Sequence, residues 1–312
     1  MADIFVQKDV HTLTRNQSFL FIGDSNMRAI YKDLIWLSQS TNDSSLIPSS
    51  HLRKKLEKSF VGDAPIDSSS RTAGRDYREL RDYYSSENGS QITFYFTTRC
   101  FSSQLEERLM AWKDDFGSYP DVVVMNGALW DLSRWGATSV SSYKENIVKL
   151  FELMKKILPI YTQLIWVTTS PISSNVKGAL ILPKLSSIGE SLRFTIVEAN
   201  RYSSYVAQRF SYDVLDLHRV FITQMQRQCP DGIHWYPDSV RMMVNMLLTH
   251  FCLSRKRKLP GRISPSKSIH LRQMITAASE ADKASKVEAE EHKKEESPGR
   301  RKLLKARRRI IP

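Results

Sequence analysis

The chain has 312 residues, of which 41% are hydrophobic and 25% are charged, so it can bury a sizeable core and is not disordered throughout. It contains 46 Lys and Arg against 33 Asp and Glu, but 18 of these basic residues and only 7 of the acidic ones lie from residue 253 onward. The excess charge therefore belongs to one end of the chain, and the remainder is not expected to recognise nucleic acid specifically. We predict one α/β domain over residues 15–252 and a basic, low-complexity, mostly disordered tail over residues 253–312.

Three cysteines, Cys100, Cys229 and Cys252, form no CxxC pair and no metal-ligand spacing. An odd set of this kind indicates buried free thiols in a reducing compartment, and we predict neither a metal site nor a cofactor. The first 17 residues contain no apolar core of a signal peptide, and no run approaches the roughly 18 to 20 apolar residues of a membrane span. These features together predict an intracellular protein.

Short apolar runs alternate along the chain with longer segments of helical spacing. The runs are Ser18–Ile22, Gln91–Thr97, Asp121–Met125, Gln163–Thr168 and a weaker fifth, Tyr212–Leu217; the helical segments are Asn26–Leu37, Phe101–Phe116, Val140–Leu158, Leu185–Phe210 and Asp238–Leu253. Nearly continuous apolar strands are typical of a parallel sheet that is covered on both faces. We predict a three-layer α/β/α sandwich with a mostly parallel, flavodoxin-like sheet, in which ligands bind beyond the carboxyl ends of the strands.

Residues 38–90 show no regular pattern and are rich in Ser and Asp. A long insertion of this kind between two strands is either a cover over the active site or a mobile loop. The sequence favours neither interpretation over the other.

Gly23, Asp24 and Ser25 close the first predicted strand and open a helix. A serine at a helix N-terminus lies where unpaired backbone N–H groups and the helix dipole favour an anion, which suits a nucleophile. The alternative is that Ser25 only caps the helix, since Ser, Asp and Gly are common at such junctions. The GDS motif alone does not distinguish a nucleophile from a helix cap.

Asp231 and His234, in DGIHW after the last predicted strand, supply the base that a serine nucleophile needs. The carboxylate of Asp231 can accept a hydrogen bond from the imidazole and fix its tautomer. The alternative is an Asp-Gly turn followed by a packed histidine. A second pair, Asp216 and His218, lies at a strand end, and we rank it below Asp231 and His234.

Three blocks in fixed order resemble one group of hydrolases: FIGDSNMRAIYKDLIWL, VVMNGALWDLSRWG and DGIHW. A strand that ends in GDS, with DxxHW before the last helix, is similar to the SGNH/GDSL hydrolases, and the three blocks together resemble their PC-esterase group. The similarity extends over roughly residues 15–252. It implies an SGNH fold and a serine esterase in which Ser25 is the nucleophile and His234 and Asp231 complete a catalytic triad.

In the SGNH hydrolases the oxyanion hole uses the N–H of the serine, a glycine N–H from a second block and an asparagine side chain from a GxND block. This sequence contains no GxND. Asn126 and Gly127, directly after the third strand, are the best substitutes, although a simple turn explains them nearly as well. Gly74, in RTAGRDYREL, is the candidate for the glycine. Loss of one donor costs on the order of 10²–10³ in rate, so an imperfect hole implies slow chemistry rather than none.

Arg28 lies one turn after the serine and resembles an arginine that PC-esterases place there. It either binds an anionic part of the substrate or acyl donor, or forms an ion pair with Asp33 or Asp24. Trp130, Asp131 and Trp135, in LWDLSRW, are candidates for lining the site. The alternative for the two tryptophans is packing in the core.

Two basic clusters, Arg255–Lys258 and Arg300–Arg309, lie in the predicted tail. Such clusters are typical of nuclear-localisation signals and of polyanion-binding segments, and the alternative is a solvated basic tail. We predict an import receptor or a polyanion as the tail's partner, and a cytoplasmic and nuclear location. No aromatic residues interleave with the clusters, so base stacking on single-stranded nucleic acid is not expected.

The function that these features predict is hydrolysis of an acyl ester by a Ser-His-Asp triad. Two alternatives remain. The first is O-acyl transfer with the same triad, as in the plant polysaccharide O-acetyltransferases that are related to the PC-esterases. The second is a non-catalytic scaffold that retains the fold, which the missing GxND block favours.

Overall fold

The computed structural model describes residues 4–39, 45–54, 57–67, 74–135, 139–174, 176–177 and 186–261. The chain divides into two compact units, residues 1–260 and 261–312. The predicted disorder of the tail and its second basic cluster, Arg300–Arg309, fall outside the described residues. No helix in the described ranges is both long and apolar enough to cross a membrane.

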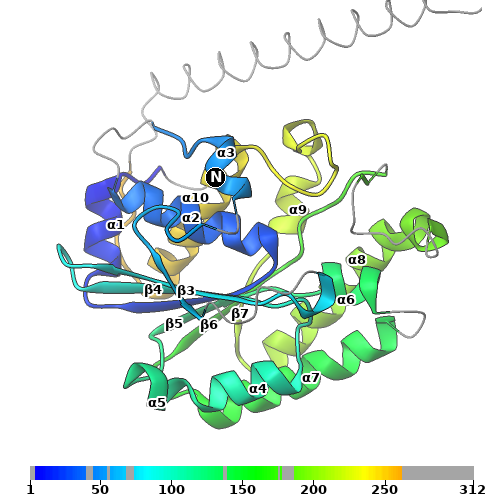
Figure 1. Ribbon diagram of the computed structural model, residues 1–312, viewed down its shortest axis with the longest axis horizontal. Helices are drawn as coiled ribbons and strands as arrows, with labels where there is room; N and C mark the ends of the chain where they lie inside the picture. Colours follow the sequence, from blue (N-terminus) through cyan, green and yellow to red (C-terminus); the bar gives the residue numbers. More distant parts are fainter. Residues whose placement is uncertain are drawn as a thin grey trace, which may run out of the picture. The chain divides into compact units, whose positions relative to one another are not determined.

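One sheet of seven strands forms the centre of the first unit (Figure 1). The strands are β1 (Ser18–Gly23), β2 (Ala64–Asp67), β3 (Glu79–Ser85), β4 (Ser90–Phe96), β5 (Val122–Met125), β6 (Gln163–Val167) and β7 (Asp213–Leu215), in the order β2-β3-β4-β1-β5-β6-β7. The run β4-β1-β5-β6-β7 is parallel, whereas β3 is antiparallel to β4 and β2 to β3. All five predicted strands are confirmed, and their spatial order is the flavodoxin-like 2-1-3-4-5, whose ligand crevice lies where the order reverses, between β1 and β5.

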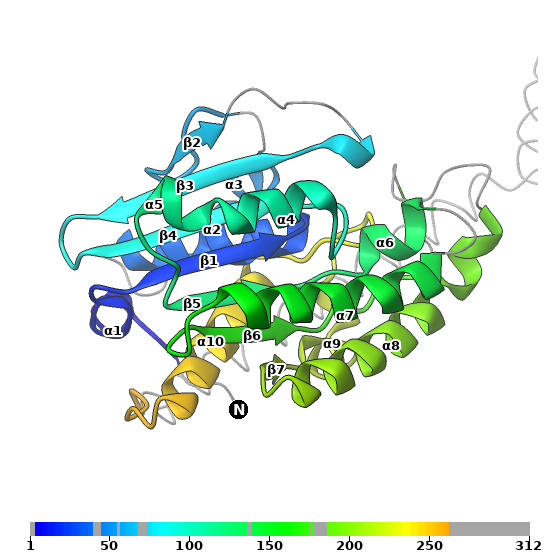
Figure 2. The same ribbon diagram turned by 90° about the horizontal axis from the view of Figure 1, so that it is seen from below.

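Helices cover both faces of the sheet, as Figures 1 and 2 show. One face carries α1 (Gln7–Thr14), α2 (Ser25–Gln39), α3 (Ser49–Arg53), α9 (Leu217–Phe221) and α10 (Pro237–Ser254); the other carries α4 (Ser103–Met110), α5 (Trp112–Phe116), α6 (Leu129–Arg134), α7 (Ser139–Ile157) and α8 (Ser186–Arg209). Along β1, Phe19 and Phe21 pack into the first layer and Leu20 and Ile22 into the second, as the period of two along a strand requires. The predicted three-layer α/β/α sandwich is confirmed.

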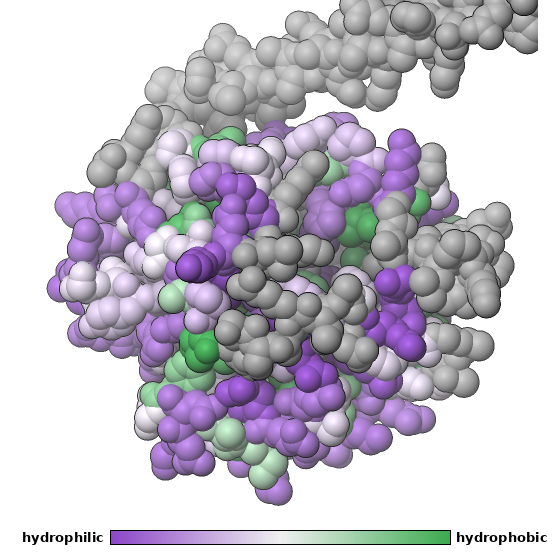
Figure 3. Space-filling view, in the orientation of Figure 1, coloured by the Kyte–Doolittle hydropathy of each residue, from purple (hydrophilic) through white to green (hydrophobic). Residues whose placement is uncertain are grey.

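Figure 3 shows one face of the molecule, on which hydrophilic residues predominate and apolar residues form small separate patches. The buried apolar residues are concentrated between the helices and the sheet, in one cluster on each face of the sheet.

The region that shows no regular pattern in the sequence, residues 38–90, contains α3, β2, a short 3-10 helix (Gly74–Asp76) and β3. β3 was not predicted because it carries Glu79 and Arg81, which are nevertheless buried. Both are paired with opposite charges from other segments, and paired charges tolerate burial. β2 is an edge strand of four residues, and its register shifts between Pro65 and Asp67.

The first unit extends beyond residues 15–252 at both ends. Val10 and Leu13 of α1 are buried in the core, and the backbone N–H of Phe5 donates to Asn245 Oδ1 at 3.1 Å. At the other end, Arg255 Nη1 donates to Gln17 Oε1 at 2.9 Å and Arg257 Nη1 to the carbonyl of Leu13 at 3.1 Å. Two arginines of the first basic cluster thus contact the folded body.

Candidate active site

The turn between β1 and α2 places Ser25 at the carboxyl edge of the sheet. Asp24 is buried, and its Oδ1 accepts a hydrogen bond from the N–H of Asn26 at 2.9 Å, which is how a helix-capping side chain acts. Burial raises the pKa of Asp24, partly offset by that hydrogen bond. Since Asp24 caps the helix, the side chain of Ser25, the first residue of α2, is left for another contact.

Gly23 is required at this turn by close packing. A Cβ on residue 23 would lie 2.3 Å from Oδ1 of Asn126 and 2.8 Å from Cβ of Met27. No side chain fits at such distances, and the turn that carries Ser25 therefore lies directly against the amide of Asn126.

The loop before α10 brings His234 to the serine. Ser25 Oγ lies 2.8 Å from His234 Nε2, and His234 Nδ1 lies 2.8 Å from Asp231 Oδ2. The other carboxylate oxygen of Asp231 accepts hydrogen bonds from the backbone N–H groups of Ile233 and His234, both at 2.9 Å. Three residues from opposite ends of the domain thus form one continuous chain of hydrogen bonds.

The charge on Asp231 is favoured in this loop. Partial burial raises the pKa of Asp231, but the hydrogen bonds from His234 and Ile233 outweigh it, so the pKa lies below its ordinary value. An ionised carboxylate beside Nδ1 holds the proton on that nitrogen and leaves Nε2 as the acceptor that faces Ser25. The tautomer is therefore the one in which the imidazole can accept the serine proton.

A pocket of about 370 Å³ opens beside these residues. Its wall includes Ser25, Asp231 and His234, together with the apolar or aromatic side chains Ala29, Leu52, Tyr77, Phe96, Trp130 and Trp235. Arg28, Gly74 and Trp130, three of the predicted site residues, also line it. Most of the apolar wall was not predicted, since no motif marks these residues.

Arg28 has a different partner from those that the sequence suggested. Its Nη1 forms an ion pair with Glu79 Oε2 at 2.7 Å, and both side chains are buried, whereas Asp33 pairs with Arg241. Tyr77 donates a second hydrogen bond to Glu79 Oε2 at 3.0 Å, and burial raises the pKa of Tyr77 to about 12. The charge of Arg28 is thus balanced by the carboxylate of Glu79.

Asn126 and Gly127 follow β5 and differ in their contacts. Asn126 is buried, and within the described part of the chain its Oδ1 has no hydrogen-bond partner, so no contact there fixes which end of the amide faces the crevice. Gly127 instead packs closely, because a Cβ there would lie 2.6 Å from Cβ of Cys100. Its carbonyl accepts a hydrogen bond from Thr169 Oγ1 at 3.0 Å. Asn126 and Gly127 line a small hollow that shares Trp130 with the pocket.

Asp131 and His218 do not line the pocket that contains Ser25, and Asp131 lines the small hollow beside it. The carboxylate of Asp131 is buried and accepts a hydrogen bond from the N–H of Cys100 at 3.0 Å. His218 Nδ1 lies 2.9 Å from the carbonyl of Thr169, while Asp216 accepts from the N–H of Arg219 and caps α9. Asp216 and His218 therefore have separate structural contacts.

The buried carboxyl group of Asp131 gives a testable dependence of stability on pH. Burial raises its pKa from 3.8 to about 6, so the folded state binds this proton more tightly than the unfolded state, and folding stability falls as the pH rises from about 4 to 6. In Asp131→Asn this loss should be absent. The free energy of unfolding of the variant minus that of the native protein should therefore rise by about 3 kcal/mol between pH 4 and pH 6 and then level off. Urea denaturation at pH 4, 5, 6 and 7 measures the difference; a difference that is constant with pH contradicts the raised pKa.

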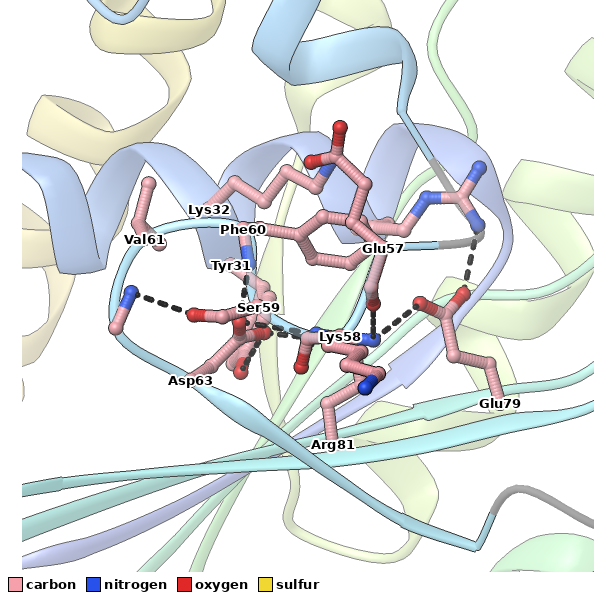
Figure 4. A network of polar contacts seen from close by, with 12 residues as sticks. Tyr31, Lys32, Glu57, Lys58, Ser59, Phe60, Val61, Asp63, Glu79 and Arg81 are labelled. Atoms are coloured by element: carbon pink, nitrogen blue, oxygen red, sulfur yellow. Dashed lines mark hydrogen bonds and ion pairs between the residues drawn. The ribbon is translucent and has the colours of Figure 1, made fainter.

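Two buried cations, Lys32 and Arg81, contact residues 49–54 and 57–63, and Figure 4 shows both side chains beside Phe60. Lys32 Nζ donates to the carbonyls of His51, Leu52 and Lys54 at 2.5, 3.3 and 2.6 Å. Burial lowers the pKa of Lys32 to about 7. Ser49 and Leu52 of this segment line the pocket, so Lys32 fixes part of its wall from behind.

Arg81 holds the continuation of the same segment. It forms a buried ion pair with Asp63, whose Oδ2 lies 2.6 Å from Arg81 Nε, and it donates to the carbonyls of Glu57 and Lys58 at 3.0 and 3.2 Å. The ring of Phe60 lies between Lys32 and Arg81, at 3.7 and 3.8 Å from their charged groups. Of residues 38–90, Ser49, Leu52, Gly74 and Tyr77 line the pocket, so part of this insertion forms its wall. Among the described residues, no group of three or more His, Cys, Asp or Glu side chains is placed to hold a metal ion.

No family model matches the chain. PC-esterase domain-containing protein 1A from Homo sapiens is 36% identical over 264 residues, which cover 84% of this chain and 57% of that protein. PC-esterase domain-containing protein 1B from Homo sapiens is 34% identical over 258 residues, which cover 81% of this chain and 58% of that protein. The chain belongs to the PC-esterase domain-containing protein family. The resemblance that the GDS and DGIHW blocks indicate is confirmed.

This PC-esterase family member spans a little more than half the length of those two relatives. It also aligns with solved structures. A lipase/acylhydrolase from Enterococcus faecalis is 12% identical, with a TM-score of 0.43, over 77% of this chain and 96% of the other. A GDSL-like lipase from Bacteroides thetaiotaomicron is 13% identical, with a TM-score of 0.45, over 80% of this chain and 92% of the other.

Proposed function

We propose that this PC-esterase family member is a serine-dependent hydrolase of acyl esters. One observation carries the proposal: Ser25, His234 and Asp231 form a continuous chain of hydrogen bonds in the wall of a pocket. The distances from Ser25 Oγ to His234 Nε2 and from His234 Nδ1 to Asp231 Oδ2 are both 2.8 Å. A serine hydroxyl is a weak nucleophile at neutral pH unless an adjacent base removes its proton. His234 is within reach for that role, and Asp231 orients it.

The reaction proceeds in two halves. Ser25 Oγ attacks the acyl carbonyl while His234 Nε2 takes its proton, and the imidazolium that forms is stabilised by Asp231. His234 then gives this proton to the leaving alcohol, which leaves the acyl group on Ser25. A water molecule, deprotonated by His234, attacks the acyl-enzyme, and the returning proton restores the hydroxyl of Ser25 as the carboxylic acid departs.

The negative charge of the tetrahedral intermediate needs hydrogen-bond donors. We assign this role to the N–H of Ser25, at the start of α2, and to the side-chain amide of Asn126, which lies against the turn at Gly23. Gly74, with a φ of +79° and a place in the pocket wall, is the candidate for a third donor. The close contacts of Gly127 support a packing role for that residue instead.

Replacement of Asn126 with alanine should lower kcat for an acetate ester by about 10²–10³-fold with little change in KM, because the donor acts mainly on charge that develops in the transition state. Initial rates with a chromogenic acetate ester measure the effect. Asn146→Ala is a matched control, since Asn146 is a buried asparagine of α7 whose Nδ2 also has no hydrogen-bond partner in the described residues. Equal losses in the two variants would show that Asn126 supports the fold rather than the chemistry.

Covalent labelling tests the proposed nucleophile directly. A fluorophosphonate probe should add once to the native protein, and peptide mass spectrometry should place it on Ser25. Labelling should be lost in Ser25→Ala and retained in Ser49→Ala, a control that is apt because Ser49 lines the same pocket. Labelling that persists in Ser25→Ala, or a native protein that takes up no probe and hydrolyses no ester, overturns the proposal.

A further inference from the structure

A second group of side chains lies beside the pocket: Arg75, Arg99, Arg134, Trp130 and Trp135, here called the arginine–tryptophan cluster. The guanidinium carbons of Arg99 and Arg75 lie 4.4 and 5.1 Å from the ring centre of Trp135. That of Arg134 lies 5.4 Å from the ring of Trp130. At these distances the rings attract the cations by their faces.

Three separate segments meet in this cluster and are tied together by hydrogen bonds. Trp135, which follows α6, donates from Nε1 to the carbonyl of Thr98 at 3.2 Å, and Thr98 Oγ1 donates to the carbonyl of Arg75 at 2.5 Å. Arg75 belongs to the short 3-10 helix, and Arg99 follows β4. The arrangement is therefore fixed by the backbone at the carboxyl edge of the sheet.

In the described part of the chain, the three guanidinium groups of the cluster are not paired with a carboxylate. Within the described ranges, none of them forms an ion pair or donates a hydrogen bond, and Nε of Arg99 and of Arg134 are buried without a partner. By contrast, the buried arginines Arg28, Arg81 and Arg241 each pair with a carboxylate. Asp131 is close enough to Arg99 to sense its charge, but its oxygens accept from Cys100. A guanidinium group without a carboxylate partner favours an anion that supplies the missing acceptor and charge.

The cluster adjoins the proposed reaction centre. Trp130 lines both the pocket and the small hollow, and Arg99 lines that hollow together with Asn126, Asp24 and Asp131. Gly74, the neighbour of Arg75, also lines the pocket. Arg28, in the pocket wall, is paired with Glu79, and Asp231 is hydrogen-bonded to His234. The arginines without a carboxylate partner in the described residues therefore lie on the α6 side of the pocket.

We propose that the arginine–tryptophan cluster binds an anionic group of the substrate, a carboxylate or a phosphate, while the uncharged acyl ester occupies the pocket. A guanidinium that is already stacked on an aromatic ring presents its N–H fork to two oxygens of such a group. The ester part of this inference rests on the proposed hydrolase function, whereas the binding of the anion does not. The preferred substrates are thus esters that carry a negative charge on the alcohol portion or near it.

Matched substrates test the inference. 4-Acetoxybenzoic acid and 4-acetoxybenzamide carry the same ester and differ in one charge, and 4-acetoxyphenyl phosphate distinguishes a preference for phosphate from one for carboxylate. The native protein should show a kcat/KM for the charged esters about tenfold or more above that for the amide, mainly through KM, as is typical of a hydrogen bond to a charged group. Arg99→Gln and Arg134→Gln should each lower that ratio about tenfold.

Arg78→Gln is the control, because Arg78 is a nearby arginine that contacts Gln104 and stacks on neither tryptophan; its ratio should stay at the native value. A structural role for Arg99 would lower the rates for charged and neutral esters equally, and that result, or a native protein without preference, overturns the inference.

Direct binding separates this inference from the proposed function. Calorimetric titration with 4-hydroxybenzoate and 4-hydroxybenzamide should show tighter binding of the carboxylate, weakened in Arg99→Gln and at high salt. If the carboxylate binds in this way but no ester is hydrolysed, the hydrolase proposal is wrong and the anion site stands. If both compounds bind equally or neither binds, the anion site is wrong, whatever the esterase assays show.

Discussion

His234→Ala should lower kcat for a neutral acetate ester by about 10⁴-fold or more, because in the proposed mechanism no other group removes the proton of Ser25. The distance of 2.8 Å from His234 Nε2 to Ser25 Oγ makes this the shortest route for that proton. Asp231→Asn should cause a loss of similar order, since an asparagine amide favours the wrong tautomer of the imidazole. Steady-state rates, with fluorophosphonate labelling as a second readout, measure both variants.

His218→Ala is the matched control for the histidine prediction. Its Nδ1 contacts the carbonyl of Thr169 rather than a carboxylate, and it lies outside the pocket wall, so kcat should stay within about twofold of the native value. Activity in His234→Ala above a tenth of the native rate would falsify the assignment of His234 as the base. Equal losses in both histidine variants point instead to a general loss of structure, which thermal unfolding detects.

Arg81→Met should lower the free energy of unfolding by about 3–5 kcal/mol, because it leaves the carboxylate of Asp63 buried without a counter-charge. Asp63 is fully enclosed and Arg81 nearly so, and the carbonyls of Glu57 and Lys58 lose their donors as well. Urea denaturation followed by circular dichroism measures the loss. Labelling of Ser25 should weaken in parallel, since the same segment continues into the pocket wall.

The surface pair Arg108 and Asp115 is the matched control for the buried pair. Arg108→Met removes an ion pair of comparable chemistry that faces solvent, and it should change stability by no more than about 1 kcal/mol. If Arg81→Met does not fold, the double variant Asp63→Asn and Arg81→Met still tests the reason, because it should recover part of the loss. Similar effects at the buried and the exposed arginine contradict the account.

The parallel part of the fold could be predicted because its strands are buried on both faces and are therefore apolar at nearly every position, as in Val122–Met125. β3 could not, because Glu79 and Arg81 are compensated by Arg28 and Asp63, and sequence pattern does not reveal such pairing across segments. One local signal was present: the turn from β3 to β4 contains Asn88-Gly89, a dipeptide typical of hairpins, and Gly89 has a φ of +68°.

The serine, the histidine and the aspartate could be proposed as a group because each follows a strand end or precedes a helix, where the topology of a parallel sheet collects side chains. The apolar wall could not, since Leu52, Tyr77 and Phe96 come from segments without a motif. The partner of Arg28 was also beyond prediction. The two acidic residues nearest to it in the sequence, Asp24 and Asp33, contact the N–H of Asn26 and the side chain of Arg241 instead. Its actual partner, Glu79, lies on a strand 51 positions further along the chain.

The two strands at the borders of the sheet have a consequence for the behaviour of the protein in solution. β7 offers three residues along its free side, and β2 offers four, interrupted by a proline and an irregular register. A sheet grows from molecule to molecule only where an edge presents a long, regular row of unpaired backbone groups. Neither border does so, which protects a large, strongly apolar sheet from edge-to-edge polymerisation when the protein is concentrated or heated.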